Sequence, residues 1–212
     1  MTRILLGLFL ALLLPATAFA ATPAAFVPAE GVDYVVIDGG QPYRPLQGRI
    51  EVVEVFAYWC PHCAAFQPMV DAWKRKLPKD VRFTYVPLTT ESGDALSRGY
   101  FATEALGAVE RTHAALFRAM HDDGMMPMNP SEGELQDWLV AQGLPAAKLK
   151  AAWTSPAMAA NLRHASAFEH AVDIEGTPTL VVNGRYRIIS GDHESMLRTA
   201  DALVAMLRRQ RR

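Results

Sequence analysis

The periodicity of apolar residues changes abruptly at Cys60. Before it, residues 50–57 read IEVVEVFA and are apolar on both alternating faces apart from Glu51 and Glu54. That pattern is typical of a central strand covered on both sides. After it, the apolar residues follow the spacing of a helix, at Cys63, Phe66, Val70, Trp73 and Leu77. The chain must therefore turn from a buried strand into a helix at this cysteine.

The elements that follow predict a parallel sheet. We expect the helix to begin near Cys60, to stop before Pro78 and to kink near Pro68, because proline removes a backbone hydrogen bond. Residues 81–88 have the composition of a second buried strand. A strand, a helix and a strand in this order form a parallel unit of an α/β fold.

A long helical segment is inserted after this unit. The stretch from Pro87 to Pro178 is far longer than the dozen or so residues that a crossover requires. Its apolar residues recur at helical spacing, as at Leu116, Phe117 and Met120. We therefore predict an all-helical insertion over residues 89–170.

Short strands and a last helix complete the expected fold. Residues 32–37 are predicted to form the first strand. Near the end of the chain, residues 179–182 and 186–189 flank an Asn-Gly dipeptide, which predicts a hairpin. An amphipathic helix is expected from about residue 194 to 209.

The first 20 residues have the pattern of a secretory signal peptide. Arg3 precedes an apolar run from Ile4 to Leu14, and small residues lead to an expected cleavage after Ala20. The apolar run is shorter than the roughly 20 residues that span a bilayer. Without this segment, which holds one arginine and no acid, the 21 basic and 22 acidic side chains become 20 and 22. This balance does not indicate a nucleic-acid partner.

The two cysteines of the chain form a single motif, Cys60-Pro61-His62-Cys63. As a structural staple the pair would contribute little, because closing a four-residue ring is worth only about 1.9 kcal/mol against roughly 3 for a fifteen-residue loop. Redox chemistry is the better explanation. At the start of a helix, unpaired backbone N–H groups and the helix dipole stabilise a thiolate at Cys60, and His62 can add a hydrogen bond or a positive charge.

The position of each cysteine predicts its role. Cys63 lies on the apolar stripe of the helix and is expected to be buried, whereas Cys60 at the helix tip is expected to reach solvent. A substrate thiolate should therefore attack Cys60 and expel Cys63, after which the second substrate thiol releases Cys60. The substrate leaves oxidised and this chain leaves reduced.

Two further sites accompany the cysteine pair. Glu54, the acid in the middle of the buried strand, should have a raised pKa and can exchange protons with Cys63; the alternative is a structural acid paired with a base. Thr177 and Pro178 precede the hairpin, where a proline suits the start of a strand. The backbone of Thr177 is a candidate for pairing with an extended substrate chain.

The motifs EVFAYWCPHC and GTPTLVVNGRY, together with the signal peptide and the helical insertion, resemble the DsbA family of periplasmic oxidases over nearly the whole mature chain. The resemblance implies a thioredoxin fold with an inserted all-helical domain, divided into a thioredoxin-like domain of residues 21–88 and 171–212 and an insertion of residues 89–170. It also implies a cis peptide bond before Pro178 and supports Glu54 as the buried acid. Some relatives carry a lysine facing that acid, whereas Tyr85 occupies the aligned position here.

The same resemblance implies the partners. Reduced, unfolded exported proteins are the expected substrates, and a quinone-linked membrane oxidase of the DsbB kind is expected to reoxidise the cysteine pair. We expect a periplasmic monomer that needs no cofactor or metal beyond its redox-active disulfide.

One alternative shares the same chemistry, and two others are metal-binding sites. A disulfide isomerase or reductase usually carries a separate dimerisation region before the catalytic domain, and the residues before Ile50 are too few for one. A zinc protein would need two more ligands, which only a four-thiolate site shared between two chains would supply. A copper site at Met120, Met125, Met126, Met128 and His121 is weighed against ordinary packing, which methionines near a loop more often serve.

Overall fold

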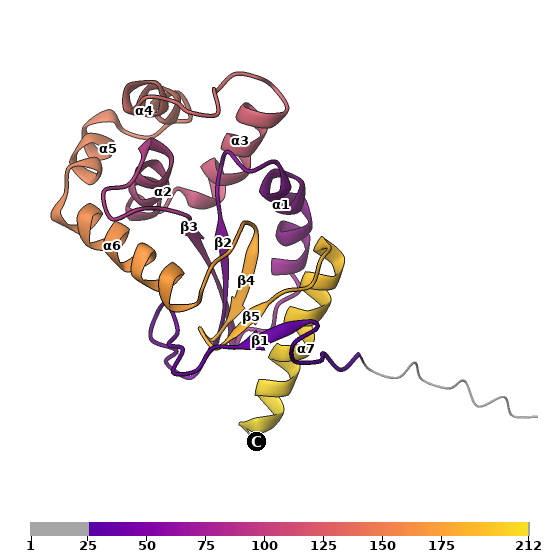
Figure 1. Ribbon diagram of the computed structural model, residues 1–212. Helices are drawn as coiled ribbons and strands as arrows, with labels where there is room; N and C mark the ends of the chain where they lie inside the picture. The colour runs from indigo at the N-terminus through magenta and orange to yellow at the C-terminus, as the bar shows by residue number, and fades with distance from the viewer. Residues whose placement is uncertain (1–25, 212) are drawn as a thin grey trace, which may run out of the picture.

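The computed structural model describes residues 26–211, which form five strands and seven helices around one sheet (Figure 1). The signal peptide expected over residues 1–20 lies outside the described residues. The strands are β1 (Tyr34–Val36), β2 (Ile50–Phe56), β3 (Val81–Pro87), β4 (Thr179–Val182) and β5 (Tyr186–Ile188). The helices are α1 (Pro61–Lys74), α2 (Ala95–Ala105), α3 (Val109–His121), α4 (Glu132–Ala141), α5 (Ala146–Trp153), α6 (Pro156–Ala171) and α7 (His193–Gln210).

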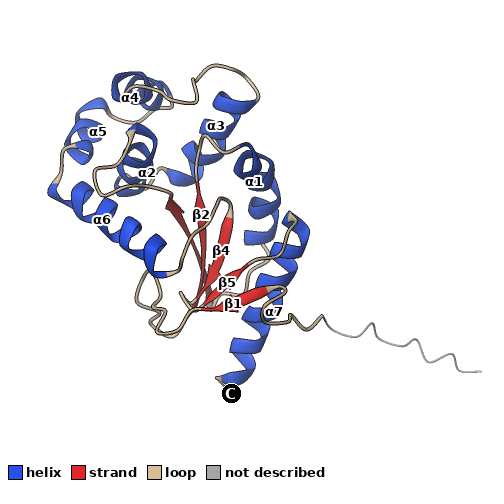
Figure 2. Ribbon diagram, viewed as in Figure 1, coloured by secondary structure: helices blue, strands red, loops and turns tan. Residues whose placement is uncertain are grey.

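The sheet is mixed and has the strand order β1-β5-β4-β2-β3. β2 runs parallel to β3 and antiparallel to β4, which confirms the predicted strand-helix-strand unit. Helices α1 and α7 lie on one side of the sheet and α6 on the other (Figures 1 and 2). Because the sheet is covered on both sides, all seven residues of β2 are buried, as its composition predicts.

Glu51 is one of the two acids of β2, and its hydrogen-bond partners explain how it can be buried. The Glu51 carboxylate accepts hydrogen bonds from Arg82 Nη2 at 2.8 Å, from Arg82 Nε at 3.1 Å and from Thr84 Oγ1 at 3.2 Å. The backbone N–H of Arg44 donates a further bond, at 3.2 Å. A buried carboxylate is tolerated when it is paired and hydrogen-bonded in this way. Glu51 therefore links β2, β3 and the segment before β2.

Helices α2 to α6 fall between β3 and β4, so the structure has the thioredoxin fold with a helical insertion that the sequence predicts. Two of these helices begin with capping boxes, at Asp94 with Ser97 and at Ser131 with Glu134. One hydrophobic core runs from the sheet into these helices. The division into domains at residues 88/89 and 170/171 stays a prediction.

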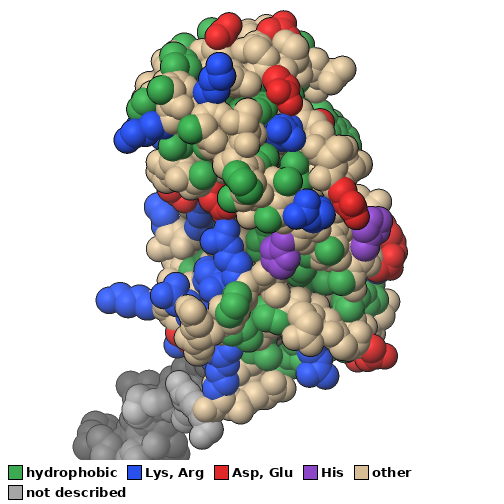
Figure 3. All heavy atoms as spheres, turned by 90° about the vertical axis from the view of Figure 1, so that its left-hand side faces the viewer, with side chains coloured by type: hydrophobic (Ala, Val, Ile, Leu, Met, Phe, Trp, Pro, Cys, Tyr) green, Lys and Arg blue, Asp and Glu red, His purple; other side chains and the backbone are tan. Residues whose placement is uncertain are grey.

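The remaining elements agree closely with expectation. The first strand is shorter than predicted, and α7 begins one residue earlier and ends one residue later than predicted. α1 is continuous across Pro68, and a kink there stays a prediction. No helix among residues 26–211 is long and apolar enough to span a bilayer. On the face turned toward the viewer in Figure 3, charges of both signs are spread between small hydrophobic patches.

The hairpin between β4 and β5 turns at Asn183 and Gly184, both with positive φ, and Arg185 N donates to Val182 O at 3.0 Å. The turn is packed against the segment before β2. A Cβ atom at Gly184 would lie 1.8 Å from the carbonyl oxygen of Gln41. This position therefore requires glycine both for its φ of 66° and for the close approach of another backbone.

We predict that Gly184→Ala lowers the free energy of unfolding by about 2–4 kcal/mol, because it adds both backbone strain and a clash with backbone. Gly133→Ala is the matched control, since a Cβ there, in the first turn of α4, has no heavy atom within 4 Å. That control should be neutral or stabilising by up to about 1 kcal/mol. Urea unfolding of the two variants measures the difference, and equal stabilities would contradict the packing described for the hairpin.

Candidate active site

Cys60 lies at the junction of the central strand and the active-site helix. It is the N-cap residue of α1, with φ −83° and ψ 117°, and Pro61 is the first helical residue. Proline is well suited to that position, because its missing N–H would have had no partner inside the helix. Cys63 follows in the first turn. Both cysteines therefore lie at the N-terminal end of α1, with Cys60 before its first residue and Cys63 within it. Both thiols are free.

The exposure of Cys60 differs from the sequence expectation. Cys60 is buried, with 5% of its surface exposed, although Cys63 is still more deeply buried at 0%. The expectation that Cys60 is an exposed cysteine is therefore wrong. The reason is a contact that is distant in sequence: Cys60 Sγ donates a hydrogen bond to the carbonyl oxygen of Thr177 at 3.2 Å. The loop before β4 thus covers part of the sulfur, while Pro61 and His62 beside it are exposed.

The peptide bond between Thr177 and Pro178 is cis, as the resemblance implies. Pro178 directly precedes β4, which is the position at the start of a strand that the sequence predicts. The structure brings Thr177 to Cys60, 117 residues away in the chain.

Cys63 has an environment that disfavours its charged form. Burial raises the pKa of the Cys63 thiol well above its usual range, while hydrogen bonding with Ala57 and Thr177 opposes this rise and nearby Glu54 and Cys60 add to it. A thiolate formed at Cys63 is therefore a strong base that favours taking up a proton.

Glu54 is the second buried acid of β2. It is 1% exposed, and neither of its carboxylate oxygens has a hydrogen-bond partner among the described residues, in contrast to the well-paired Glu51. Burial raises its pKa to about 8, with the positive charge of Lys74 lowering it and the negative charges of Asp71 and Cys60 raising it. At neutral pH this carboxyl is therefore mostly protonated.

The position opposite Glu54 on the neighbouring strand is Tyr85, as the alignment of the sequence indicates. Its hydroxyl accepts hydrogen bonds from Gln67 Nε2 at 3.0 Å and from Lys74 Nζ at 3.3 Å. Both donors belong to α1 and were not identified from the sequence. Their spacing of seven residues, two helical turns, is a signal that places them on the same helix face.

Two histidines also lie nearer to the site than the sequence indicates. The ring of His193, at the start of α7, stacks at a tilt on Phe66 with centroids 4.8 Å apart. Partial burial and then the neighbouring His62 lower its pKa. His121 Nε2 lies 2.7 Å from the carbonyl oxygen of Tyr58, in the loop that leads to Cys60. Histidines from two other helices therefore contact the active-site helix and the loop before it.

The methionine cluster does not form one group. Met120 and Met126 are buried in the core, whereas Met125 and Met128 are exposed. Across residues 26–211, no three or more His, Cys, Asp and Glu side chains are grouped so that they could hold a metal ion. The packing interpretation of these methionines accounts for the two buried ones.

A thioredoxin fold that presents a Cys-x-x-Cys pair at the start of α1, beside a cis-proline loop, defines a thiol:disulfide oxidoreductase. Comparison with known proteins agrees. The Thioredoxin family model matches residues 47–202. The thiol:disulfide interchange protein DsbA of Bordetella pertussis is 34% identical over 206 residues, covering 93% of this chain and 96% of the relative. The chain belongs to the DsbA family.

Solved structures of DsbA proteins are also similar to this chain. The crystal structure of the oxidoreductase DsbA from Xylella fastidiosa has a TM-score of 0.82 and 40% identity, covering 86% of this chain and 99% of that one. For the crystal structure of Pseudomonas aeruginosa DsbA the TM-score is 0.75 and the identity 32%, with 85% of this chain and 94% of that one covered. The fold and the family are therefore established together.

The environment of Glu54 predicts how stability depends on pH. The folded pKa of about 8 exceeds the ordinary value of 4.5, so the folded state keeps a proton that the unfolded chain loses between these values. Stability from this group is complete below about pH 4.5 and is lost as the pH rises toward 8. Glu54→Gln removes this loss, and we expect it to be more stable than the parent by up to about 3 kcal/mol at pH 7.

Urea unfolding of both proteins between pH 4 and 8.5 measures this effect. Glu169, whose pKa burial raises to about 7, is present in both, so the difference between them isolates Glu54. Glu91→Gln, at an exposed position, is the control and should leave the profile unchanged. A constant difference between Glu54→Gln and the parent over this range would contradict the raised pKa.

Proposed function

We propose that this protein is a periplasmic oxidase that introduces disulfide bonds into exported proteins through the Cys60-Cys63 pair, with Cys60 as the residue attacked by the substrate. The observation that carries the proposal is the asymmetry of the two sulfurs. Cys60 caps α1 beside the Thr177 carbonyl, whereas Cys63 is fully enclosed. A substrate thiolate approaching from solvent therefore meets Cys60 first.

The cap position favours a charged sulfur on Cys60. The first backbone N–H groups of α1 have no partner inside the helix, and Pro61 contributes none, so those of the next residues in the first turn are available to the sulfur. The positive end of the helix dipole acts in the same direction. His62, exposed beside the sulfur, is positioned to add a hydrogen bond or a charge. A stabilised thiolate stabilises the reduced protein and makes its disulfide more oxidising.

Cys63 and Glu54 act together in the proposed reaction. Attack at Cys60 breaks the Cys60-Cys63 bond and leaves the bonding electrons on Cys63 as a thiolate. The Glu54 carboxyl, protonated at neutral pH, gives its proton to that thiolate, directly or through water. The second substrate thiol then attacks the mixed disulfide and expels Cys60. The substrate gains a disulfide and the protein is left with two reduced cysteines.

Substrate binding is proposed at the loop before β4. The backbone of Thr177, next to Cys60 and ahead of Pro178, offers main-chain groups for an extended substrate segment. The substrates are reduced, unfolded proteins, whose exposed chain suits such pairing. A membrane oxidase of the DsbB kind would return the pair to its disulfide, and no cofactor takes part besides that disulfide. Cleavage after Ala20 would release residues 21–212 as a monomer, with residues 21–88 and 171–212 forming the catalytic domain and 89–170 the insertion.

The roles of the two cysteines are tested with a reduced, unfolded secreted substrate and the oxidised protein. Cys60→Ser and Cys63→Ser are a matched pair, since each leaves one thiol. We predict that both lose turnover, because neither forms the intramolecular disulfide. In addition, Cys63→Ser should trap a covalent complex with a substrate that carries an activated disulfide, whereas Cys60→Ser should not.

Mass spectrometry of the complexes identifies the linked residue. A complex through Cys63 in the Cys60→Ser protein, formed as fast as the complex through Cys60, would contradict the assignment. Redox titration against glutathione distinguishes the oxidase from a reductase, since a strongly reducing potential would favour the latter.

A further inference from the structure

Lys74 belongs to α1, and its side chain contacts β3, the strand that pairs with the strand of Glu54. It lies in the last turn of α1, and its side chain is 17% exposed. Its ammonium group crosses the face of Tyr85, with Nζ 4.7 Å from the ring centroid and 3.3 Å from the hydroxyl oxygen. Tyr85 is the residue opposite Glu54 on β3. The cation is therefore held on the same side of the sheet as the unpaired carboxyl.

The Tyr85 hydroxyl holds the ammonium of Lys74 in place. It accepts two hydrogen bonds, from Gln67 Nε2 and from Lys74 Nζ. Glu54 is the residue opposite Tyr85 on β2, and neither of its oxygens has a hydrogen-bond partner among the described residues. The positive charge of Lys74 therefore acts on Glu54 through space, in a buried environment that weakens screening by solvent.

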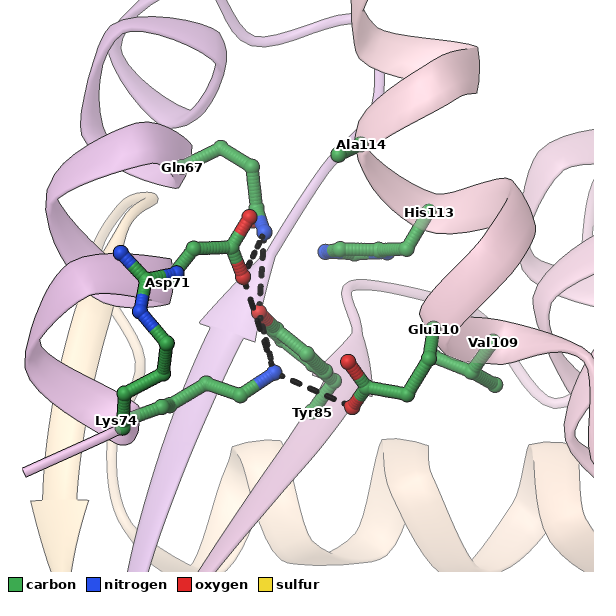
Figure 4. Close-up of a pocket in the computed structure, with 9 residues that line it drawn as sticks. Gln67, Asp71, Lys74, Tyr85, Val109, Glu110, His113 and Ala114 are labelled. Carbon is green, nitrogen blue, oxygen red and sulfur yellow. Dashed lines mark hydrogen bonds and ion pairs between the residues drawn. The ribbon is translucent and has the colours of Figure 1, made fainter. Parts of the chain in front are cut away.

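Gln67, Lys74 and Tyr85 line a cavity of about 250 Å³ between α1, β3 and α3 (Figure 4). The side chains of Gln67, Tyr85 and His113 point into it from three different elements. Gln67 Oε1 and His113 Nε2 are buried there without a hydrogen-bond partner in the described part of the chain. The cavity has both the volume and the polar groups that ordered water requires, so an ammonium can remain hydrated at its edge.

The other charged groups around the cavity do not substitute for Lys74. His113 is fully buried, which lowers its pKa far below the usual value, so it stays neutral. Arg75 is exposed. The acids Asp71 and Glu110 lie 3.7 and 3.2 Å from Lys74 Nζ, and the Glu110 side chain is 85% exposed, so its pairing is weakened by solvent. Lys74 is therefore the cation best placed to act on Glu54.

We infer that Lys74 is a positioning residue for the proton transfer between Glu54 and Cys63, in which its ammonium, held against Tyr85, stabilises the ionised form of Glu54. This inference rests on the proposed role of Glu54. When Glu54 gives its proton to the Cys63 thiolate, the carboxylate left behind is buried, and Lys74 reduces the cost of that charge. A proton from solvent then restores the carboxyl, and the net transfer is one proton from water to Cys63.

The inference is tested by the pKa of Glu54 and by the pH dependence of the reaction. In Lys74→Met, which keeps the length of the side chain and removes its charge, the pKa of Glu54 should rise from about 8 by about one unit. Carbon-13 NMR of the Glu54 carboxyl measures the pKa. The pH midpoint of mixed-disulfide resolution should move in the same direction by a similar amount.

Three further variants distinguish an effect of the Lys74 charge from an effect of altered packing. Lys74→Arg keeps the charge and should restore the parent midpoint to within about half a unit. Lys76→Met removes a similar charge two residues along, at an exposed position outside the cavity, and should change neither measurement. Tyr85→Phe keeps the ring and removes the hydroxyl that accepts from Lys74 Nζ, and should raise the pKa of Glu54 by less than Lys74→Met does.

Combining Lys74→Met with Glu54→Gln separates the inference about Lys74 from the proposed role of Glu54. In that background Lys74→Met should no longer move the pH midpoint. If Lys74→Met leaves the pKa of Glu54 unchanged, the inference is overturned while the proposed function stands. If Glu54→Gln itself leaves the reaction profile unchanged, the proposed role of Glu54 fails, and the NMR titration still reports whether Lys74 acts on the carboxyl.

Discussion

The junction between β2 and α1 determines the chemistry of this protein. A fully buried strand ends shortly before Cys60, and the helix begins directly after it, so one cysteine is the N-cap residue of the helix and the other faces the core. Cys60, with 5% of its surface exposed, is thereby more accessible than Cys63, which is fully buried three residues later. The oxidation proposed here requires that difference, because one sulfur must accept attack and the other must leave.

Burial has opposite consequences for the two acids of β2. Glu51 is held by Arg82, Thr84 and a backbone N–H, so its charge is compensated and it links the strands. Glu54 lies on the other face, under α1, without such partners. Its protonated state at neutral pH follows from that lack of compensation, and this is the basis on which we propose Glu54 as the proton donor to Cys63. Lys74 adjusts this balance from the edge of the cavity.

Features that depend on the local pattern of residues could be predicted from the sequence. The strand before Cys60, the buried stripe of α1 and the hairpin at Asn183 and Gly184 follow from periodicity and turn chemistry. Contacts between distant segments were not predictable in this way. The burial of Cys60 depends on Thr177, which lies 117 residues away. Lys74 meets Tyr85 only because α1 packs over β3, and no periodicity specifies where a long, flexible side chain ends.

The central claim, that the two thiols differ in accessibility and reactivity, is tested most directly by alkylation of the reduced protein with iodoacetamide at neutral pH. Peptide mass spectrometry then gives the rate at each cysteine, with the urea-unfolded chain as the reference in which both react alike. The account predicts that Cys60 is alkylated in the folded protein while Cys63 stays unmodified. Equal rates at the two cysteines in the folded protein would contradict it.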